Sequence, residues 1–141
     1  MTAEVQAMLT PVLALVTLSL IVWIWMYATR IPAMQKAKID PQNARHPGSL
    51  DSLPSSARQV ADNYNHLMEQ PTIFYALVFY IAMTGHADSW HVWFAWAYVI
   101  LRVLHTLVQC TVNIVSLRFT IFTTSTLVLI AMTVRELLML A

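Results

Sequence analysis

The stretch Arg102-Val-Leu-His105-Thr-Leu-Val-Gln109, which continues to Asn113, decides how this chain must fold. It lies inside a long apolar run, yet its polar residues recur three or four positions apart. At about 100° per residue they fall on one narrow helical face, with His105 at its edge. These residues are Arg102, Thr106, Gln109 and Asn113. Because a guanidinium in the middle of an apolar helix is costly unless polar groups face it, the stretch predicts a buried helix whose polar face meets other helices.

The composition around this stretch is that of an integral membrane protein. Of the 141 residues, 58% are hydrophobic and only 11% are charged, whereas soluble domains carry about 25% charged residues. The formal net charge of +1 provides no basic surface for nucleic acid. The single cysteine, Cys110, excludes an intrachain disulfide framework. We therefore expect a chain that lies in the lipid bilayer and binds no nucleic acid.

Four segments have the length and apolar character of membrane-crossing helices, which need about 20 residues each. The first lacks the basic start and small-residue cleavage site of a signal peptide, so we interpret it as a retained helix. The sequence thus predicts one domain over residues 1–141, an all-α integral membrane bundle of four transmembrane helices. The expected helices cover about 8–29, 56–84, 89–113 and 118–138.

Local signals refine the ends of these helices. Ser56 and Gln59 have the spacing of a capping box at the start of the second helix. Pro71 removes a backbone donor inside that helix and is expected to kink it. Asp88 or Ser89 has the chemistry of a helix start for the third helix.

The connection between the first two helices, residues 30–55, is of a different character. Of the eight lysines and arginines in the chain, five lie between positions 30 and 58, and this segment also carries four of the prolines. Such a segment is typical of an extended loop outside the bilayer. The excess of basic residues assigns the loop to the cytoplasm and both termini to the outside. We expect a multi-pass protein of a bacterial inner membrane.

The second helix offers polar partners for the organising stretch. Asp62, His66 and Glu69 share one face, with Asn65 beside it. A short turn joins this helix to the third, so the two are antiparallel neighbours, and Glu69 and Arg102 lie about equally far from the turn. An ion pair between them would explain how both are tolerated in the membrane.

Two interpretations of this polar network remain open. It is either an ion pair that only fixes the packing of the helices, or part of a ligand site that extends toward the cytoplasm. In the second case His66, Asn65, His105 and Gln109 continue the network, and Arg30 and Arg118 stand at its mouth. No second His/Glu motif completes a metal site, so we expect none. His46, His86 and His91 are expected to be surface or interface residues without a role.

Two motifs resemble one known family. Residues 61–74, Ala-Asp-Asn-Tyr-Asn-His-Leu-Met-Glu-Gln-Pro-Thr-Ile-Phe, resemble the second-helix motif of the MAPEG family, the membrane-associated proteins in eicosanoid and glutathione metabolism. Arg102-x-x-His105-Thr-x-x-Gln109, followed by Arg118, resembles the third-helix motif and the next arginine of its microsomal prostaglandin E synthase branch. The resemblance extends over essentially the whole chain, including the helix count and the loop lengths.

The resemblance implies a homotrimer with a glutathione site between neighbouring subunits, near the cytoplasmic side. It implies that Arg118 stabilises the glutathione thiolate, because a nearby cation lowers the pKa of a thiol. It also implies that Glu69, Arg102, His105 and Arg30 contact glutathione or brace the residues that do.

The chain departs from the family pattern at several site positions. Asp62 and Asn65 stand where glutathione-using relatives tend to carry arginines, and His66 stands where an asparagine is common. Gln109 and Phe122 replace residues with aromatic hydroxyl groups. Fewer cations weaken the hold on a tripeptide with two carboxylates.

Two functions follow from these observations. The first is a glutathione-dependent transferase or peroxidase that acts on a lipophilic small molecule, an electrophile delivered from the bilayer. The second is a non-catalytic membrane scaffold or lipid-binding subunit whose polar network only fixes packing. The retained Arg102, His105 and Arg118 favour the enzyme, and the missing arginines favour the scaffold.

Overall fold

The structure is a computed structural model that describes residues 2–140, all of it helix or connecting segment, with no strand among these residues. Its elements are α1 (Ala3–Lys36), the short 3₁₀ helix η1 (Pro41–Asn43), α2 (Ser55–Glu69), α3 (Pro71–Thr84), α4 (Ser89–Cys110) and α5 (Val115–Met139).

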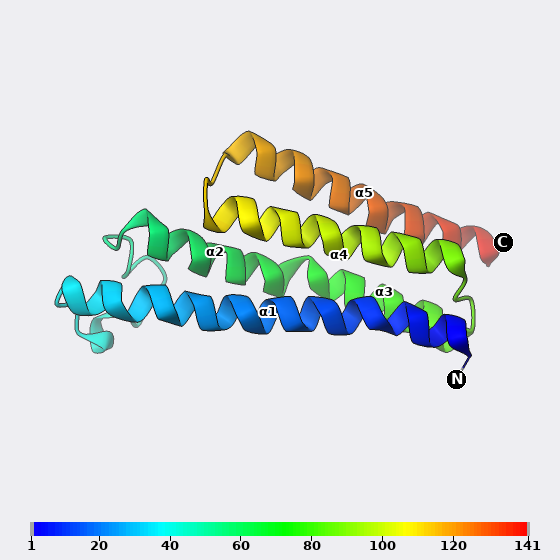
Figure 1. Cartoon of the computed structure of the whole chain (residues 1–141), viewed down its shortest axis with the longest axis horizontal. Helices are drawn as coiled ribbons and strands as arrows, with labels where there is room; N and C mark the ends of the chain where they lie inside the picture. The colour runs from blue at the N-terminus through cyan, green and yellow to red at the C-terminus, as the bar shows by residue number, and fades with distance from the viewer. Residues whose placement is uncertain (1, 141) are drawn as a thin grey trace.

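The helices lie side by side along one long axis (Figure 1). Helix α4 packs against α1, α2 and α5, and α2 and α3 follow one another in line. The two termini and the turn between α3 and α4 lie at one end of the molecule, whereas the segment between η1 and α2 and the turn between α4 and α5 lie at the other. This arrangement agrees with the expectation that both termini are on the same side of a membrane.

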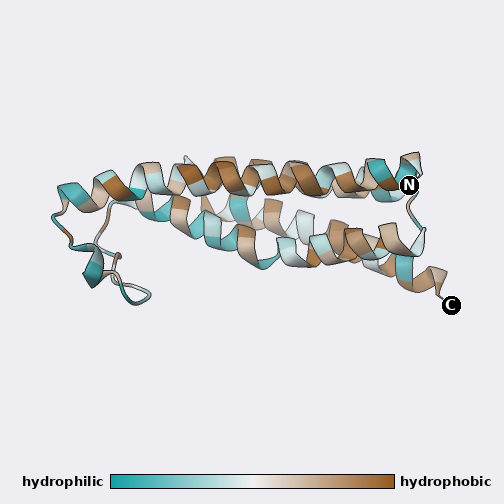
Figure 2. Ribbon diagram, turned by 90° about the horizontal axis from the view of Figure 1, so that it is seen from below, coloured by the Kyte–Doolittle hydropathy of each residue, from teal (hydrophilic) through white to brown (hydrophobic). Residues whose placement is uncertain are grey.

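Three helices are long and apolar enough to cross a membrane, namely α1, α4 and α5. Hydrophobic residues cover the middle of the long helices, while hydrophilic residues gather at the end that holds the loop (Figure 2). The chain is therefore a multi-pass integral membrane protein. Helices α2 and α3 have 15 and 14 residues, so neither alone reaches the length of a span.

The interruption between α2 and α3 lies at Pro71, where the sequence predicts a kink. Gln70 keeps helical dihedral angles, φ −60° and ψ −37°. Pro71, however, has no N–H to bond the Leu67 carbonyl. The backbone forms a tighter turn here instead, in which the Ile73 amide donates to the carbonyl of Gln70, three residues earlier, at 3.0 Å. The two helices thus form one interrupted rod rather than two separate elements.

The prediction that the first helix ends at residue 29 is wrong, since α1 continues through Arg30 to Lys36. The apolar run ends at Arg30, but the following residues still favour a helix, which leaves the membrane region before it stops. The end is closed by a residue with left-handed backbone, Lys38 at φ 53°. The amides of Lys38 and Ile39 donate to the carbonyls of Gln35 and Met34, both at 3.1 Å, which is the Schellman pattern. The loop therefore begins at residue 37, not at residue 30.

The capping box expected at Ser56 and Gln59 is also wrong. Helix α2 begins at Ser55 after Pro54, and no side chain caps it. The Gln59 amide instead donates to the Cys110 carbonyl at 2.9 Å, so this side chain satisfies the end of α4 rather than the start of its own helix.

The turn between α4 and α5 is as long as the sequence suggests but lies three residues earlier, since α4 ends at Cys110 instead of 113 and α5 begins at Val115 instead of 118. Asn113 has φ 50° and its amide donates to the Val108 carbonyl at 2.7 Å. An asparagine tolerates this left-handed conformation, so Asn113 ends the helix instead of extending its polar face. Arg118 accordingly lies in the first turn of α5.

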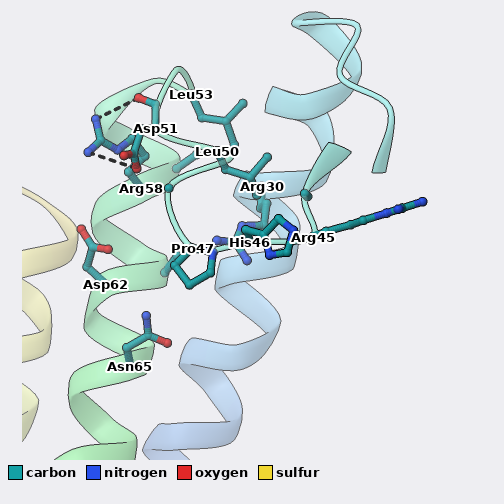
Figure 3. Close-up of a pocket in the computed structure, with 14 residues that line it drawn as sticks. Arg30, Arg45, His46, Pro47, Leu50, Asp51, Leu53, Arg58, Asp62 and Asn65 are labelled. Carbon is teal, nitrogen blue, oxygen red and sulfur yellow. Dashed lines mark hydrogen bonds and ion pairs between the residues drawn. The ribbon is translucent and has the colours of Figure 1, made fainter. Parts of the chain in front are cut away.

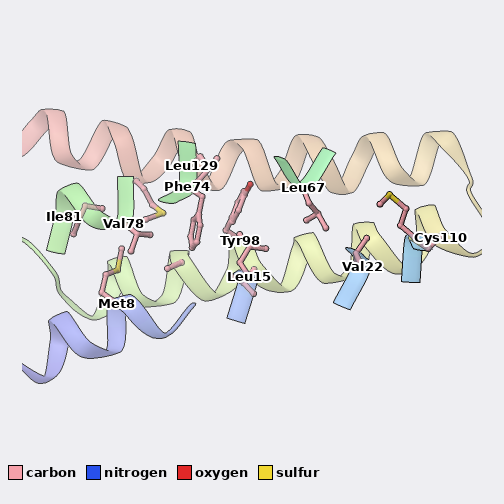
Figure 4. Close-up of a cluster of buried hydrophobic side chains, with 14 of the residues drawn as sticks. Met8, Leu15, Val22, Leu67, Phe74, Val78, Ile81, Tyr98, Cys110 and Leu129 are labelled. Atoms are coloured by element: carbon pink, nitrogen blue, oxygen red, sulfur yellow. The ribbon is translucent and has the colours of Figure 1, made fainter. Parts of the chain in front are cut away.

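The core is a thin apolar seam between the helices (Figure 4). Met8, Leu15 and Val22 of α1 lie on one side of it, seven positions apart and at most 1% exposed. Across the seam, the rings of Phe74 and Tyr98 stack with centroids 4.6 Å apart. Most of α1 outside this stripe is exposed in a single chain, as expected for a helix that faces lipid.

Candidate functional site

The polar face predicted on α4 is buried in the structure. Arg102, His105, Thr106 and Gln109 are all at most 3% exposed. Because these side chains lie in the helix that contacts α1, α2 and α5, they face other helices and not lipid. The prediction of a buried polar stripe is therefore confirmed for all but Asn113, which lies outside the helix.

The groups of α2 that meet this stripe are amides and a backbone carbonyl. Asn63, fully buried, donates to the Thr106 hydroxyl at 3.2 Å and accepts from it at 3.4 Å. Arg102 donates to the His66 carbonyl at 3.4 Å. Together with the bond from Gln59 to Cys110, these contacts tie α2 to α4 along one line.

A further amide holds the interrupted region. Gln70 donates to the Thr126 hydroxyl at 2.7 Å and accepts from the hydroxyls of Tyr98 and Ser125, each at 3.4 Å. Sequence reasoning missed Gln59, Asn63 and Gln70. The signal was their spacing, since positions 59, 63 and 70 lie on one helical face.

The predicted ion pair between Glu69 and Arg102 is wrong. The Glu69 carboxylate lies 3.2 Å from His66 Nδ1 and its side chain is 68% exposed. Arg102 is fully buried, and its Nε and one Nη have no hydrogen-bond partner among residues 2–140. The face of α2 that carries Asp62, Asn65 and Glu69 points outward because the neutral amide face on its other side can be buried at lower cost.

One pocket joins three of the predicted site residues. It has a volume of about 190 Å³ and lies between α2, α4 and α5. His66, His105 and Arg118 line it together with Val115, Phe119 and Phe122. The His105 ring is 6.1 Å from that of His66 and 6.2 Å from that of Phe122. The pocket thus combines imidazole and guanidinium groups, which can bind an anion, with an apolar wall.

Within this pocket, Arg118 is positioned by the preceding turn. One of its Nη atoms donates to the Asn113 side-chain oxygen, while its Nε has no partner among the described residues. His105 Nδ1 is likewise buried without a partner. Both atoms are buried, so they lie beneath the accessible surface of the pocket.

Arg30 and Asn65 line a different pocket of about 370 Å³, between the end of α1, the loop and the start of α2. Figure 3 shows Arg30 beside His46, with Asn65 further along α2. Arg58, on the same helix, is turned to Asp51, whose carbonyl it meets at 3.1 Å. No residue lines both pockets.

The remaining candidates reach neither pocket. Gln109 and Arg102 are buried inside the subunit, and Glu69 is exposed. Within residues 2–140, no three side chains of histidine, cysteine, aspartate or glutamate are grouped as metal ligands. The single chain therefore brings together His66, His105 and Arg118, and leaves the other predicted site residues apart.

A family model described as MAPEG matches residues 8–138, nearly the whole chain. The chain belongs to the MAPEG family. The family includes glutathione transferases and related proteins, which indicates the general kind of function. No curated protein and no solved structure matches the chain. The particular activity of this MAPEG protein must therefore be argued from its own residues.

Proposed function

We propose that this MAPEG protein is a glutathione-dependent transferase or peroxidase that acts on a lipophilic electrophile from the bilayer. The observation that carries the proposal is the pocket formed by His66, His105 and Arg118 against Phe119 and Phe122. The guanidinium of Arg118 supplies a positive charge for a thiolate. The aromatic wall, which lies on α5, supplies an apolar surface for the second substrate.

Both reactions begin with an activated glutathione thiol. A thiol attacks poorly until it loses its proton, and a nearby cation lowers its pKa. In the transferase reaction the glutathione sulfur forms a bond to the electrophilic carbon while the leaving group takes the bonding electrons. In the peroxidase reaction two glutathione thiols form one disulfide, and the peroxide is reduced to an alcohol and water.

Glutathione is larger than the pocket of one subunit, so the proposal includes a homotrimer with sites between neighbours. The pocket with Arg30 and Asn65 and the pocket with Arg118 share no residue. In the proposed homotrimer, the site joins the first pocket of one subunit to the second pocket of its neighbour. In this assembly α2 and α3 cross the membrane together as a fourth span, and Glu69 and Asp62 face the ligand amino group. Gln109 and Arg102 brace the walls from inside.

The proposal also includes an orientation. The loop and the turn between α4 and α5 face the cytoplasm, where glutathione is available, and both termini face outward. Five of the eight lysines and arginines lie between positions 30 and 58, which supports this orientation in a bacterial inner membrane.

A scaffold without catalysis is the second candidate. It is favoured by the contacts that already engage many of the polar side chains. Asn63 of α2 bonds to α4 and Gln70, just after α2, bonds to α5, while Glu69 pairs with His66 and Arg118 bonds to Asn113. In that case the network stabilises the bundle and the pocket holds lipid.

The two candidates are separated by measurements on purified protein. Glutathione binding at millimolar concentration and conjugation of a generic electrophile are compared between wild type, Arg118→Ala and Arg118→Lys. We expect Arg118→Ala to lower the conjugation rate about 100-fold, and Lys to restore it only partly because it lacks the planar guanidinium.

Lys36→Ala is the matched control, since Lys36 is an exposed cation at the same end that lines neither pocket. It should conjugate at the wild-type rate. If wild type binds no glutathione at millimolar concentration, the enzyme is excluded and the scaffold remains.

A further inference from the structure

A second group of ionisable side chains lies at the opposite end of the molecule from the pockets. It joins the turn before α4, the first turn of α4 and the last turns of α5. Its members are His86, Asp88, His91, Arg135 and Glu136. His91, expected as a surface or interface residue without a role, is fully buried, and Glu136 is 3% exposed. Buried titratable groups at this density call for a physical explanation.

His91 lies between oxygen atoms on both sides of its ring. Its Nδ1 is 3.0 Å from Asp88 Oδ1 and 3.1 Å from the His86 carbonyl oxygen. A carbonyl only accepts, and Asp88 is paired with Arg135, so its carboxylate is ionised and also accepts. Nδ1 of His91 therefore carries a hydrogen.

The other nitrogen of His91 faces Glu136. Nε2 lies 3.3 Å from Glu136 Oε1, close enough for an ion pair but outside hydrogen-bond geometry, and neither atom has a hydrogen-bond partner among the described residues. The second oxygen of Glu136 lies 2.9 Å from His86 Nδ1. A neutral imidazole with its hydrogen on Nδ1 would direct the lone pair of Nε2 at an ionised carboxylate, which is repulsive.

The hydrogens of two neutral imidazoles do not cover these contacts. His91 Nδ1 donates one to the His86 carbonyl, and His86 Nδ1 donates the other to Glu136. The close pair of His91 Nε2 and Glu136 Oε1 then has no hydrogen between its two acceptor atoms. An additional proton, held by His91 as an imidazolium or by Glu136 as a carboxylic acid, would replace this repulsion with attraction.

The charges lead to the same conclusion. Asp88 and Glu136 carry two negative charges and Arg135 carries one positive charge, so with neutral histidines the group has a net charge of −1. The side chains of Asp88 and Arg135 are partly exposed, at 38% and 30%, but Glu136 is buried, and a buried carboxylate without a cationic partner is costly. One added proton makes the group neutral. From α3 no aspartate, glutamate, histidine, lysine or arginine faces the group, and α1 carries only Glu4 at this end.

We propose that the cluster of His86, His91 and Glu136 is a proton-binding site, which holds one proton between α4 and α5 and thereby fastens the end of α5 to the turn before α4. Loss of this proton leaves facing acceptors and a buried negative charge, so the last turns of α5 separate from the turn. Because the folded state binds a proton that the unfolded chain releases, stability falls as the pH rises. The site is independent of the proposed glutathione chemistry at the other end.

A direct test locates the proton in the wild-type protein in detergent. Nitrogen NMR of the histidine rings reports whether His91 is an imidazolium, and infrared spectroscopy reports a protonated carboxyl group. The expected result at neutral pH is one or the other, with the carboxyl band absent in Glu136→Gln. A neutral His91 together with an ionised Glu136 would overturn the proposal.

A second test follows thermal unfolding with pH. Between about pH 6 and about pH 9 the wild-type Tm should fall by about 3 °C or more. In Glu136→Gln the neutral amide supplies its own hydrogens, so the Tm should change little over this range. Glu4→Gln, an exposed carboxylate at the same end, should keep the wild-type slope. An equal slope in wild type and Glu136→Gln would also overturn the proposal.

Discussion

Asn63 and Thr106 bond to each other in both directions inside the interface of α2 and α4, at 3.2 and 3.4 Å, and both are at most 2% exposed. Neither helix can rotate or slide without leaving one of these polar groups unpaired. Polar contacts of this kind are a main source of specific packing between membrane helices, where apolar packing alone provides little driving force. The pair therefore fixes the register of the two helices that carry the candidate site.

The first prediction concerns this pair. Asn63→Ala should lower the free energy of unfolding by about 1–3 kcal/mol, because it leaves the Thr106 hydroxyl buried without a partner. Adding Thr106→Val should cost little more, with a coupling of about 0.6 kcal/mol or above. Unfolding in detergent measures both. Asn65→Ala is the control, since Asn65 is an exposed asparagine on the same helix. Equal costs for Asn63→Ala and Asn65→Ala would contradict the structure.

The second prediction concerns Glu69 and Arg102, which the structure separates. Because Glu69 is 68% exposed and pairs only with His66, Glu69→Gln should change stability by less than about 1 kcal/mol. Arg102 is buried without a carboxylate partner, so Arg102→Met, of similar volume, should be neutral or stabilising.

Both variants are measured by the same unfolding experiment. A loss of about 3–5 kcal/mol on either change is the value for a broken buried ion pair. Such a loss for Glu69→Gln would show that the carboxylate reaches Arg102 in the membrane, as the sequence alone suggested.

The sequence predicts the class of fold and half of the site. The composition predicts the membrane helices, and the helical spacing of polar residues predicts the buried face with Arg102, His105 and Gln109. Both features depend only on the local sequence pattern. The contact between α2 and α4 was expected, but the face of α2 that makes it could not be read in the same way. Helix α2 has two polar faces, one with charged side chains and one with amides. Which of them is buried depends on which face finds hydrogen-bond partners on α4, and this is not visible in the sequence of α2 alone.

The helix ends were mispredicted for a related reason. A fall in hydropathy at Arg30 indicates where the membrane ends, but α1 continues to Lys36 because the next residues are still compatible with a helix. Likewise, the sequence led us to expect His91 as a surface or interface residue without a role. Its burial depends on Glu136, which lies far away in the sequence and comes close only when α5 packs on α4.

The third prediction concerns the start of α4, which Asp88 caps through the His91 amide at 3.0 Å. Partial burial of the carboxyl acts against ionisation, but the His91 amide and the positive charges of His91 and Arg135 outweigh it and hold the pKa of Asp88 below its usual 3.8. A lowered pKa stabilises the fold above the unfolded value, and this contribution is lost as the pH falls below about 4.

Two variants separate the cap from the charge. Asp88→Asn keeps a good cap but removes the ionisation, so the part of the acid destabilisation that comes from Asp88 should disappear. Asp88→Ala removes both and should cost about 1 kcal/mol at neutral pH. Acid titrations of thermal unfolding measure these effects. If Asp88→Asn lost stability with acid as steeply as wild type, the ionised cap would not contribute.

The last prediction concerns orientation. Residues 37–54 and the turn between α3 and α4 lie at opposite ends of the molecule, so they must face opposite sides of the membrane. In the orientation that we propose from the lysine and arginine excess, the loop faces the cytoplasm. Ser52→Cys and Ser89→Cys, both at exposed positions, report the two ends in a Cys110→Ala background. In right-side-out vesicles an impermeant thiol reagent should label the cysteine at 89 and not the one at 52, and inverted vesicles should give the reverse. Labelling at 52 in right-side-out vesicles would place the Arg118 pocket outside, away from cytoplasmic glutathione, and would move the His91 and Glu136 cluster to the cytoplasmic side.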